Sequence, residues 1–280
     1  MFKLGGVFTE KYVLMQEKET LLIPLLGKAK ENEKEKPVLI DKKAAEIVNQ
    51  IDYDFESLKV PEKTNIMMCM RAKLIDNFVR NFFTGGKEGA ALHLGCGLDS
   101  RYDRIGNDSI DWYDVDFKEV IDIRRHFYSE TDNYRMIATS VTYPDWIEKI
   151  PSGEKHYIVI AEGLFMYLKE DEIKKLINRL KERIGSYTLI FDAFSVTAAK
   201  RIKDHPSLKK TGAMVHWGIN NPEELVKWGL GIQFIEEMYF TDNVEIRKLN
   251  TGTRLVFKLA NLFKTAKTAH RVLVCRIGCQ

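Results

Sequence analysis

The chain has 280 residues, of which 45% are hydrophobic and 30% are charged, and its formal net charge is +3. A chain of this length can bury roughly three quarters of its unfolded surface, so we expect one compact unit. The nearly balanced charge argues against general nucleic-acid binding, and the lack of a long apolar stretch or a signal-peptide pattern predicts a cytoplasmic protein without a membrane span.

The first segments of the chain have the character of peripheral elements. Residues 19–29 are apolar but contain Pro24 and Gly27, which predicts at best a broken helix. Charges of alternating sign in residues 28–36 predict a solvated surface stretch. Asp41 is a good N-cap residue, and we expect a helix to begin directly after it.

A longer helix is predicted between Thr64, a plausible N-cap, and the glycines at 85–86. At about 100° per residue, one face is apolar and has Arg71 at its centre; this face holds Met67, Met68, Leu74, Ile75, Phe78 and Phe82. The opposite face is expected to be solvated and holds Lys73, Asp76, Asn77, Arg80 and Asn81. A buried guanidinium needs a partner, which is either an internal aspartate or the carboxylate or phosphate of a ligand.

Residues 90–101 form the stretch around which the chain is organised. A short apolar run enters a turn at Gly95 and Gly97, and such a turn lets the backbone pass close to a bound cofactor. Ser100 stands where a dinucleotide fingerprint would have its third glycine, and the Gly-Lys-Ser/Thr of a phosphate loop is absent. The turn therefore indicates a nucleotide-like ligand without a pyrophosphate signature.

Strands and helices then alternate, which is typical of a mostly parallel sheet. We expect strands at 110–115, 134–139, 157–161 and 188–191, the last closing at Asp192, and helices at 118–128 and 170–184. Asp116 lies about twenty residues beyond the glycines, where an acid can bind ribose hydroxyls. Asp114 is a competing choice, and a helix-capping role is the alternative for Asp116. Gly95, Asp116, Ser140 and Glu162 would meet at the carboxyl ends of the strands.

The last third of the chain interrupts this alternation. Residues 193–228, which include Asp204-His205-Pro206, are expected to form a cap insertion over the acceptor site. A sixth strand is predicted at 232–239 and a seventh at 271–277. Between them, residues 253–269 form an amphipathic basic helix whose apolar side is expected to pack against the sheet; a membrane surface or an acidic partner is the alternative.

Three segments together resemble the leucine carboxyl methyltransferase family, in particular its bacterial polyketide O-methyltransferase branch. They are Leu-Gly-Cys-Gly-Leu-Asp-Ser-Arg at 94–101, Val-Asp-Phe at 115–117 and Glu-Gly-Leu-Phe-Met-Tyr-Leu at 162–168. Further segments also fit, at 19–29, 41–45, 51–55, 216–218 and 269–271. The resemblance implies an α/β fold with a doubly wound, mostly parallel seven-stranded sheet of the Rossmann-like class I methyltransferase type, its last strand antiparallel. It also implies a helical N-terminal cap, over residues 1–88, before a methyltransferase core at 89–280.

The resemblance further implies S-adenosylmethionine as the methyl donor. Carried over residue by residue, it makes Arg71 the partner of the cofactor's carboxylate. Gly95 and Gly97 would let the backbone approach the methionine moiety, and Asp116 would hold the ribose.

The adenine end of the implied cofactor site departs from the family. Ser140 stands where the family usually has an aspartate that faces the adenine amino group. A neutral hydroxyl can accept that hydrogen bond, but more weakly than a carboxylate. Val141 and Glu162 complete the set of residues expected to line the cofactor cavity.

The chemistry of methyl transfer makes few demands on side chains. The reaction is an in-line displacement, so alignment of the acceptor with the methyl group supplies much of the acceleration. A carboxylate acceptor is already ionised near neutral pH, whereas a phenol, with a pKa near 10, would gain from a base. No base stands out in the sequence. Tyr167 and His216 are the candidates for the acceptor site, His93 is expected to be a core histidine, and no role is assigned to His126, His156, His205 or His270.

We therefore hypothesise an S-adenosylmethionine-dependent O-methyltransferase that acts on a carboxyl oxygen, or alternatively a phenolic hydroxyl, of a small-molecule acceptor such as a polyketide-like compound. Methylation of a protein C-terminal carboxylate and a non-catalytic, cofactor-binding regulatory role are the alternatives. A nicotinamide-dependent oxidoreductase is a third hypothesis, weakened by the missing third glycine. The four cysteines show no metal-ligand spacing, so no metal site is expected. The sequence does not predict the oligomeric state.

Overall fold

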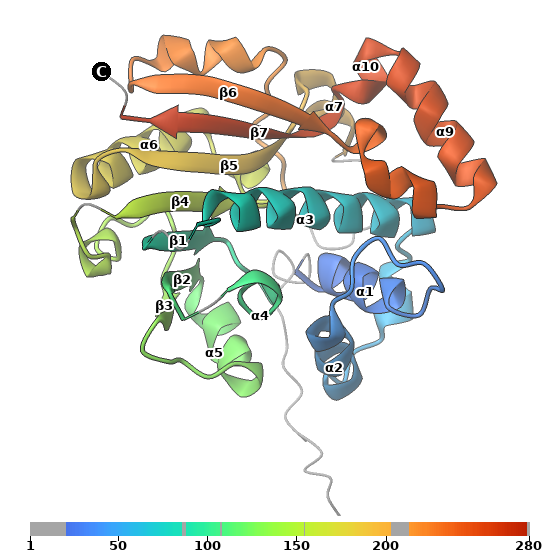
Figure 1. Ribbon diagram of the computed structural model, residues 1–280, viewed down its shortest axis with the longest axis horizontal. Helices are drawn as coiled ribbons and strands as arrows, with labels where there is room; N and C mark the ends of the chain where they lie inside the picture. Colours follow the sequence, from blue (N-terminus) through green and yellow to red (C-terminus); the bar gives the residue numbers. More distant parts are fainter. Residues whose placement is uncertain (1–20, 86–87, 107, 154, 203–212, 279–280) are drawn as a thin grey trace, which may run out of the picture.

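The computed structural model describes residues 21–85, 88–106, 108–153, 155–202 and 213–278. Its strands form one seven-stranded sheet of order β3-β2-β1-β4-β5-β7-β6 (Figure 1). The strands are β1 Gly89–Leu94, β2 Ile110–Asp116, β3 Tyr134–Ala138, β4 His156–Ala161, β5 Tyr187–Phe194, β6 Ile232–Tyr239 and β7 His270–Ile277. β1 to β5 pair in parallel, while β7 is antiparallel to both β5 and β6. The doubly wound fold implied by the sequence is confirmed.

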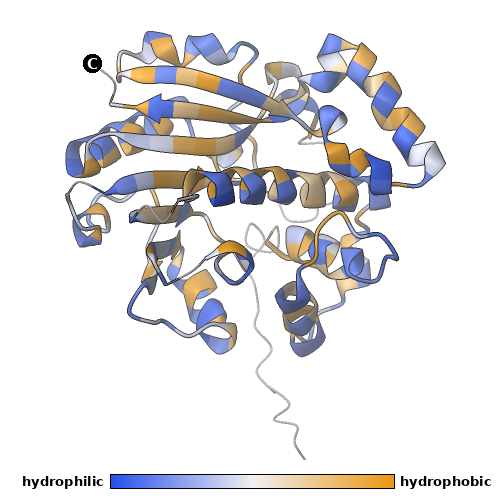
Figure 2. Ribbon diagram, viewed as in Figure 1, coloured by the Kyte–Doolittle hydropathy of each residue, from blue (hydrophilic) through white to orange (hydrophobic). Residues whose placement is uncertain are grey.

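Helices cover both faces of this sheet. They are α1 Leu22–Glu31, α2 Lys42–Gln50, α3 Glu62–Phe82, α4 Arg101–Ile105, α5 Lys118–Phe127, α6 Glu170–Ile184, α7 Val196–Ile202, α9 Thr251–Leu262 and α10 Lys264–Lys267. Side chains alternate between the two faces of a strand, so each strand contributes to two cores. One core contains Ile158 and Ile160 of β4 with α3, and the other contains Val159 with α6. Figure 2 shows the apolar residues running along the central strands and recurring at intervals along the helices.

The N-terminal helices differ from the sequence expectations in two respects. α1 is continuous, because Pro24 lies in its first turn, where a missing N–H costs nothing. Gly27 faces Asn65 of α3 so closely that a Cβ atom there would lie 3.0 Å from the Asn65 Oδ1 atom. The solvated stretch predicted from residue 28 is also wrong at its start, since Lys28 is 2% exposed and lies 2.9 Å from Asp99. Asp41 caps α2 as predicted, accepting a hydrogen bond from the Ala44 N–H at 2.9 Å.

Many predicted strand and helix bounds agree with the structure to within one residue, and α3 and β5 are among the exceptions. α3 begins at Glu62, after Pro61 as its N-cap, and not after Thr64, and it ends at Phe82, three residues before Gly85. β5 continues to Phe194, because residues 192–194 pair with β7. Asp192 therefore lies within the strand and not beyond it. Of the predicted cap insertion, residues 203–212, which include Asp204-His205-Pro206, lie outside the described residues.

The basic helix near the C-terminus does not pack as predicted. It is divided at Phe263 into α9 and α10, because the backbone of Phe263 is extended. α9 packs through Phe257, which is buried, while the apolar row expected to face the sheet points outward; Leu262 is 76% exposed and Phe263 64%. Periodicity gave the amphipathic character of the helix correctly but not the side that packs. Among the described residues, none of the helices combines the length and apolar character needed to cross a membrane.

Candidate active site

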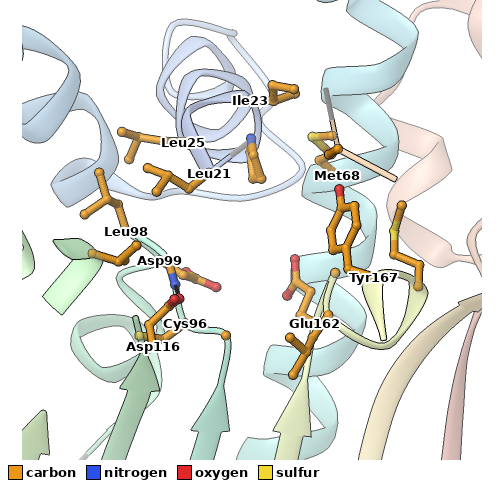
Figure 3. Close-up of a pocket in the computed structure, with 18 of the residues that line it drawn as sticks. Leu21, Ile23, Leu25, Met68, Cys96, Leu98, Asp99, Asp116, Glu162 and Tyr167 are labelled. Atoms are coloured by element: carbon orange, nitrogen blue, oxygen red, sulfur yellow. Dashed lines mark hydrogen bonds between the residues drawn. The ribbon is translucent and has the colours of Figure 1, made fainter. Parts of the chain in front are cut away.

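A cavity of about 810 Å³ lies between the carboxyl ends of the parallel strands and α1, with the first turns of α3 along one side (Figure 3). The strand order reverses between β1 and β4, and ligands of doubly wound sheets bind at such a switch point. All nine residues proposed from the sequence line this cavity: Arg71, Gly95, Gly97, Asp116, Ser140, Val141, Glu162, Tyr167 and His216. The structure thus brings together every predicted site residue, from segments almost 150 residues apart.

The loop after β1 is shaped by its two glycines and by Asp116 at the end of β2. Gly95 and Gly97 have φ angles of +62° and +53°, a conformation that residues with a Cβ atom rarely adopt. The Asp116 carboxylate accepts hydrogen bonds of 2.7 Å from the N–H groups of Gly97 and Phe117. Burial raises the pKa of Asp116 from its usual value, against the effect of these two donors. One side chain therefore holds the loop in place while facing the cavity.

The competing residue, Asp114, does not line the cavity and is surrounded by hydrogen-bond donors. Its Oδ1 faces the ring of His93 at 3.2 Å and accepts from the Trp112 indole at 2.9 Å, and its Oδ2 accepts from the Tyr134 hydroxyl at 2.6 Å and from Arg124. Burial disfavours its charge, but Arg124, His93 and Tyr134 together more than offset this, and the pKa of Asp114 falls to about 2. Asp114 is a structural carboxylate, and Asp116 is the acid that a ligand can reach.

Arg71 is held between two carboxylates, Glu162 directly after β4 and Asp192 within the neighbouring strand β5. Its Nε donates to Glu162 Oε1 at 2.9 Å, and its Nη1 donates to Asp192 Oδ2 at 3.0 Å. Burial, the largest influence, favours the neutral acids, yet the guanidinium groups of Arg71 and Arg101 hold the pKa of Glu162 below its usual value. Nη2 makes no hydrogen bond to a described residue. The structure therefore shows the internal ion pair that the sequence left open, and it leaves one donor group of Arg71 for a ligand.

Asp76, on the outer side of α3, is buried, and the prediction that it is solvated is wrong. Asp76 is 0% exposed and accepts from Nε of Arg101 at 2.8 Å and from Nε of Arg104 at 2.7 Å. Both arginines come from α4, which packs against this side of α3. Burial opposes the charge of Asp76, but the two guanidinium groups lower its pKa. Arg101 also contacts Glu162, so an ionic chain joins the outside of α3 to the cavity wall.

The remaining predicted residues lie along the cavity from the third strand to the C-terminal segment. The Ser140 hydroxyl is 2.9 Å from the Thr142 hydroxyl, and Val141 beside it is buried. Tyr167 extends from the short helix after β4 towards Met68 of α3 (Figure 3). His216 is anchored by its backbone, whose N–H donates to the Met166 carbonyl at 2.8 Å.

Two histidines have larger roles in the structure than the sequence suggested. His93 is buried as expected, but its Nε2 lies 3.0 Å from Arg101 Nη1 and it also lines the cavity. His270, to which no role was assigned, also lines the cavity, and its Nε2 lies 2.6 Å from Asp192 Oδ2. The signal for His270 is its place as the first residue of an antiparallel last strand. Such a strand begins at the edge where its parallel neighbours end.

The cavity has features that suit S-adenosylmethionine. Its volume is within the range of about 300–1,000 Å³ that is usual for cofactor sites. Each Asp116 oxygen already accepts one N–H, and a carboxylate has about four acceptor positions, so two remain for hydroxyl donors. At the other side, Arg71 Nη2 can meet a carboxylate. The residues present thus fit a molecule with a diol at one end and an amino-acid group at the other.

Comparison with known proteins gives a consistent set of relatives. Residues 22–181 match the family model for leucine carboxyl methyltransferase. The chain is 34% identical over 256 residues to the tetracenomycin polyketide synthesis O-methyltransferase TcmP of Streptomyces glaucescens, covering 91% of this chain and 94% of that protein. It is 28% identical over 253 residues to the S-adenosyl-L-methionine-dependent methyltransferase dpfgK of Gibberella zeae, covering 82% and 84%. A crystal structure of a DUF574-family protein from Streptomyces avermitilis resembles the fold with a TM-score of 0.54 at 10% identity, covering 84% of this chain and 89% of that one.

Proposed function

This chain belongs to the leucine carboxyl methyltransferase family and is an S-adenosylmethionine-dependent methyltransferase, and from that premise we propose that it methylates an oxygen atom of a small molecule. The acceptor group in this proposal is a carboxyl or a phenolic hydroxyl. The observation that carries it is the convergence of all nine sequence-proposed residues on one cavity at the switch point of the sheet. A cytoplasmic location is part of the same proposal.

In this proposal the cofactor lies along the edge formed by the ends of β1, β2, β3 and β4. Asp116 accepts hydrogen bonds from the ribose hydroxyls, and the backbone at Gly95 and Gly97 passes beside the methionine part. Ser140 and Val141 meet the adenine. Nη2 of Arg71 donates to the carboxylate of the cofactor's methionine part. The other two contacts of Arg71 hold the side chains of Glu162 and Asp192 in place. Glu162 forms part of the cavity wall beside the amino-acid end of the cofactor.

When bound, S-adenosylmethionine supplies an electrophilic methyl group on a sulfonium. The protein's contribution is to hold an acceptor oxygen in line with that methyl group and to exclude water. The cavity wall beyond Glu162 is apolar and includes Met67, Met68, Met166 and Phe194. Such a wall favours an apolar or aromatic acceptor and fits the polyketide named for the Streptomyces relative. Tyr167 and His216 are the polar groups that we assign to the acceptor end.

Two other functions stay open to the same fold. The family's name refers to a protein's leucine carboxyl group, so a peptide C-terminus is one alternative acceptor. The second is a cofactor-binding protein without turnover, which the replacement of the usual aspartate by Ser140 would favour. Both make predictions that differ from the main proposal, because the first requires a peptide acceptor and the second allows none.

Isothermal titration with S-adenosylhomocysteine, with NADH as the parallel control, tests the cofactor assignment of the site. Micromolar binding of S-adenosylhomocysteine alone is the expected result. Mass spectrometry of mixtures with the cofactor and a panel of aromatic carboxylic acids, phenols and short peptides then identifies the acceptor class. Cofactor binding without conversion of any acceptor in the panel would contradict the proposed O-methylation and favour the regulatory alternative.

A further inference from the structure

The imidazole of His270 is held in one orientation in the wall of the cavity. His270 opens β7 and pairs with Phe194 at the end of β5. The ring of Phe194 stacks on the imidazole with 3.9 Å between ring centroids, and the ring of Phe240 meets it edge-on at 4.9 Å. With Nε2 at 2.6 Å from the Asp192 carboxylate, both the plane and the direction of the imidazole are fixed.

The contact with Asp192 determines which nitrogen of His270 carries the proton. An ionised carboxylate can only accept hydrogen bonds, so the proton is on Nε2 and the lone pair is on Nδ1. Nδ1 makes no hydrogen bond in the described part of the chain, and it is not one of the buried polar atoms left unsatisfied there. Since His270 lines the cavity, Nδ1 is the ring nitrogen that a bound molecule can reach.

Three charged groups face His270 and set the protonation of this pair. Asp192 and Glu162 favour the imidazolium and Arg71 opposes it, but burial has the largest effect and lowers the pKa of His270 below its ordinary value of 6.5. Asp192 stays ionised, because Arg71 and His270 lower its pKa despite the opposing effect of burial. At neutral pH the site therefore presents a neutral imidazole backed by a carboxylate, the arrangement found in general-base histidines.

The side chains beside His270 suit a neutral acceptor. Met166, Phe194 and Ala213 belong to one apolar cluster and line this part of the cavity. A carboxylate is ionised without help near neutral pH, so a base beside it would have no proton to take. A phenol has a pKa near 10 and is almost entirely protonated under the same conditions. A base in an apolar pocket is thus explained by a hydroxyl acceptor and not by a carboxylate.

We propose that His270 is the general base for a phenolic acceptor and that Asp192 is its positioning residue. This inference rests on the proposed function, since it concerns the acceptor of the same methyl transfer. The O–H bond of the phenol breaks and its proton moves to Nδ1 of His270, while the oxygen bonds to the methyl carbon. The carbon–sulfur bond breaks with its electron pair on sulfur. The products are a methyl ether, S-adenosylhomocysteine and an imidazolium, which afterwards releases its proton to water.

The pH dependence of turnover shows whether His270 acts as a general base or only lines the cavity. With a phenol that the wild-type enzyme converts, kcat is expected to fall below the pKa of His270 and to be level above it. General-base catalysis typically contributes about 10²–10⁴-fold, so His270→Gln should lower kcat at pH 7 by at least about 100-fold. The variant's rate should then climb steadily towards the pKa of the phenol itself. With an aromatic carboxylic acid, the same substitution should change kcat by less than about threefold.

A second readout does not depend on turnover. A hydroxyanthraquinone, whose visible absorption differs between phenol and phenolate, is titrated with pH in the cavity of the protein saturated with S-adenosylhomocysteine. Nδ1 of the neutral imidazole can accept a hydrogen bond from the phenol but cannot donate one to the phenolate, so the apparent pKa of the bound phenol should be higher in the wild type than in His270→Gln. The matched control is His156→Gln, which should behave as the wild type. His156 is the exposed first residue of β4 and lies at the amino end of the parallel strands, away from the cavity at their carboxyl ends. Unchanged melting temperature and unchanged S-adenosylhomocysteine affinity in His270→Gln exclude misfolding.

The possible results separate a failure of this inference from a failure of the proposed function on which it rests. An unchanged pH profile and phenol spectrum in His270→Gln overturn the inference. Conversion or binding of carboxylic acids but of no phenol in the panel overturns it as well, and leaves the proposed function standing. If neither class of acceptor is methylated, the proposed function itself fails and the inference fails with it.

Discussion

Replacing Arg71 by lysine tests whether the fork between Glu162 and Asp192 stabilises the fold. The guanidinium reaches both carboxylates, at 2.9 and 3.0 Å, whereas a single ammonium can meet only one of them well. Loss of one charge-assisted hydrogen bond in a buried site costs about 1.5–3 kcal/mol. At roughly 2.1 cal/mol/K per residue, 280 residues give an unfolding entropy of roughly 0.6 kcal/mol/K, so the melting temperature should fall by about 3–5 °C.

The same variant also reports on the ligand. Nη2 of Arg71 is the donor that we assign to the cofactor's carboxylate, so Arg71→Lys should weaken S-adenosylhomocysteine binding more than tenfold at 25 °C. Thermal melts of the ligand-free protein followed by circular dichroism measure the first effect, and isothermal titration measures the second. Arg80→Lys, exposed near the end of the same helix, should shift the melting temperature by less than about 1 °C. An unshifted melting temperature in Arg71→Lys would refute the ion-pair reasoning, and unaltered affinity would limit Arg71 to an internal role.

Three further substitutions probe other parts of the same structure. Asp76→Asn leaves Arg101 and Arg104 with one buried carboxylate fewer and should cost about 3 kcal/mol, seen as a fall of about 5 °C in the melting temperature; a change under 1 °C would contradict the importance of this cluster. Ser140→Asp should tighten S-adenosylhomocysteine binding about fivefold by titration calorimetry, because a charged acceptor strengthens the hydrogen bond from the adenine amino group; equal or weaker binding would place the adenine elsewhere. Asp114, whose folded-state pKa of about 2 lies below the unfolded value of 3.8, contributes about 2 kcal/mol that is present above pH 4 and is lost as pH falls towards 2. Urea denaturation between pH 5 and pH 3 should therefore show a weaker pH dependence in Asp114→Asn than in the wild type, and parallel curves would show that Asp114 is not the source.

The parallel half of the sheet and its ligand edge could be predicted from the sequence. Continuous apolar runs mark strands buried on both faces, and the residues that follow them must gather at one edge. Gly95, Asp116 and Glu162 could be brought together by this argument alone. The choice between Asp114 and Asp116 could not, because residues two apart in one strand point to the same face, and only the tertiary structure shows that Asp114 is surrounded by donors while Asp116 lies at the strand end.

The errors share a physical cause, which is that periodicity describes one element at a time. Asp76 looked solvated because a helix was assumed to have one buried face, whereas arginines from a second helix cover its other side. Leu262 looked buried because an apolar row does not reveal whether anything packs on it. His270 looked idle because its role depends on Asp192, a partner 78 positions away that only strand pairing brings into contact.

The order of the site along the chain has a consequence for how such enzymes diversify. The groups assigned to the cofactor end with Glu162, whereas Tyr167, His216 and His270 come later in the chain; Tyr167 lies just before α6, and the two histidines lie after it. The family model matches residues 22–181 and so covers the first block but little of the second. A recombination event or an engineered chimera that exchanges everything after α6 would therefore replace His216 and His270 and retain Tyr167 together with the residues assigned to the methyl donor. Such an exchange must preserve Asp192, because this residue of the exchanged segment forms an ion pair with Arg71 of the retained segment.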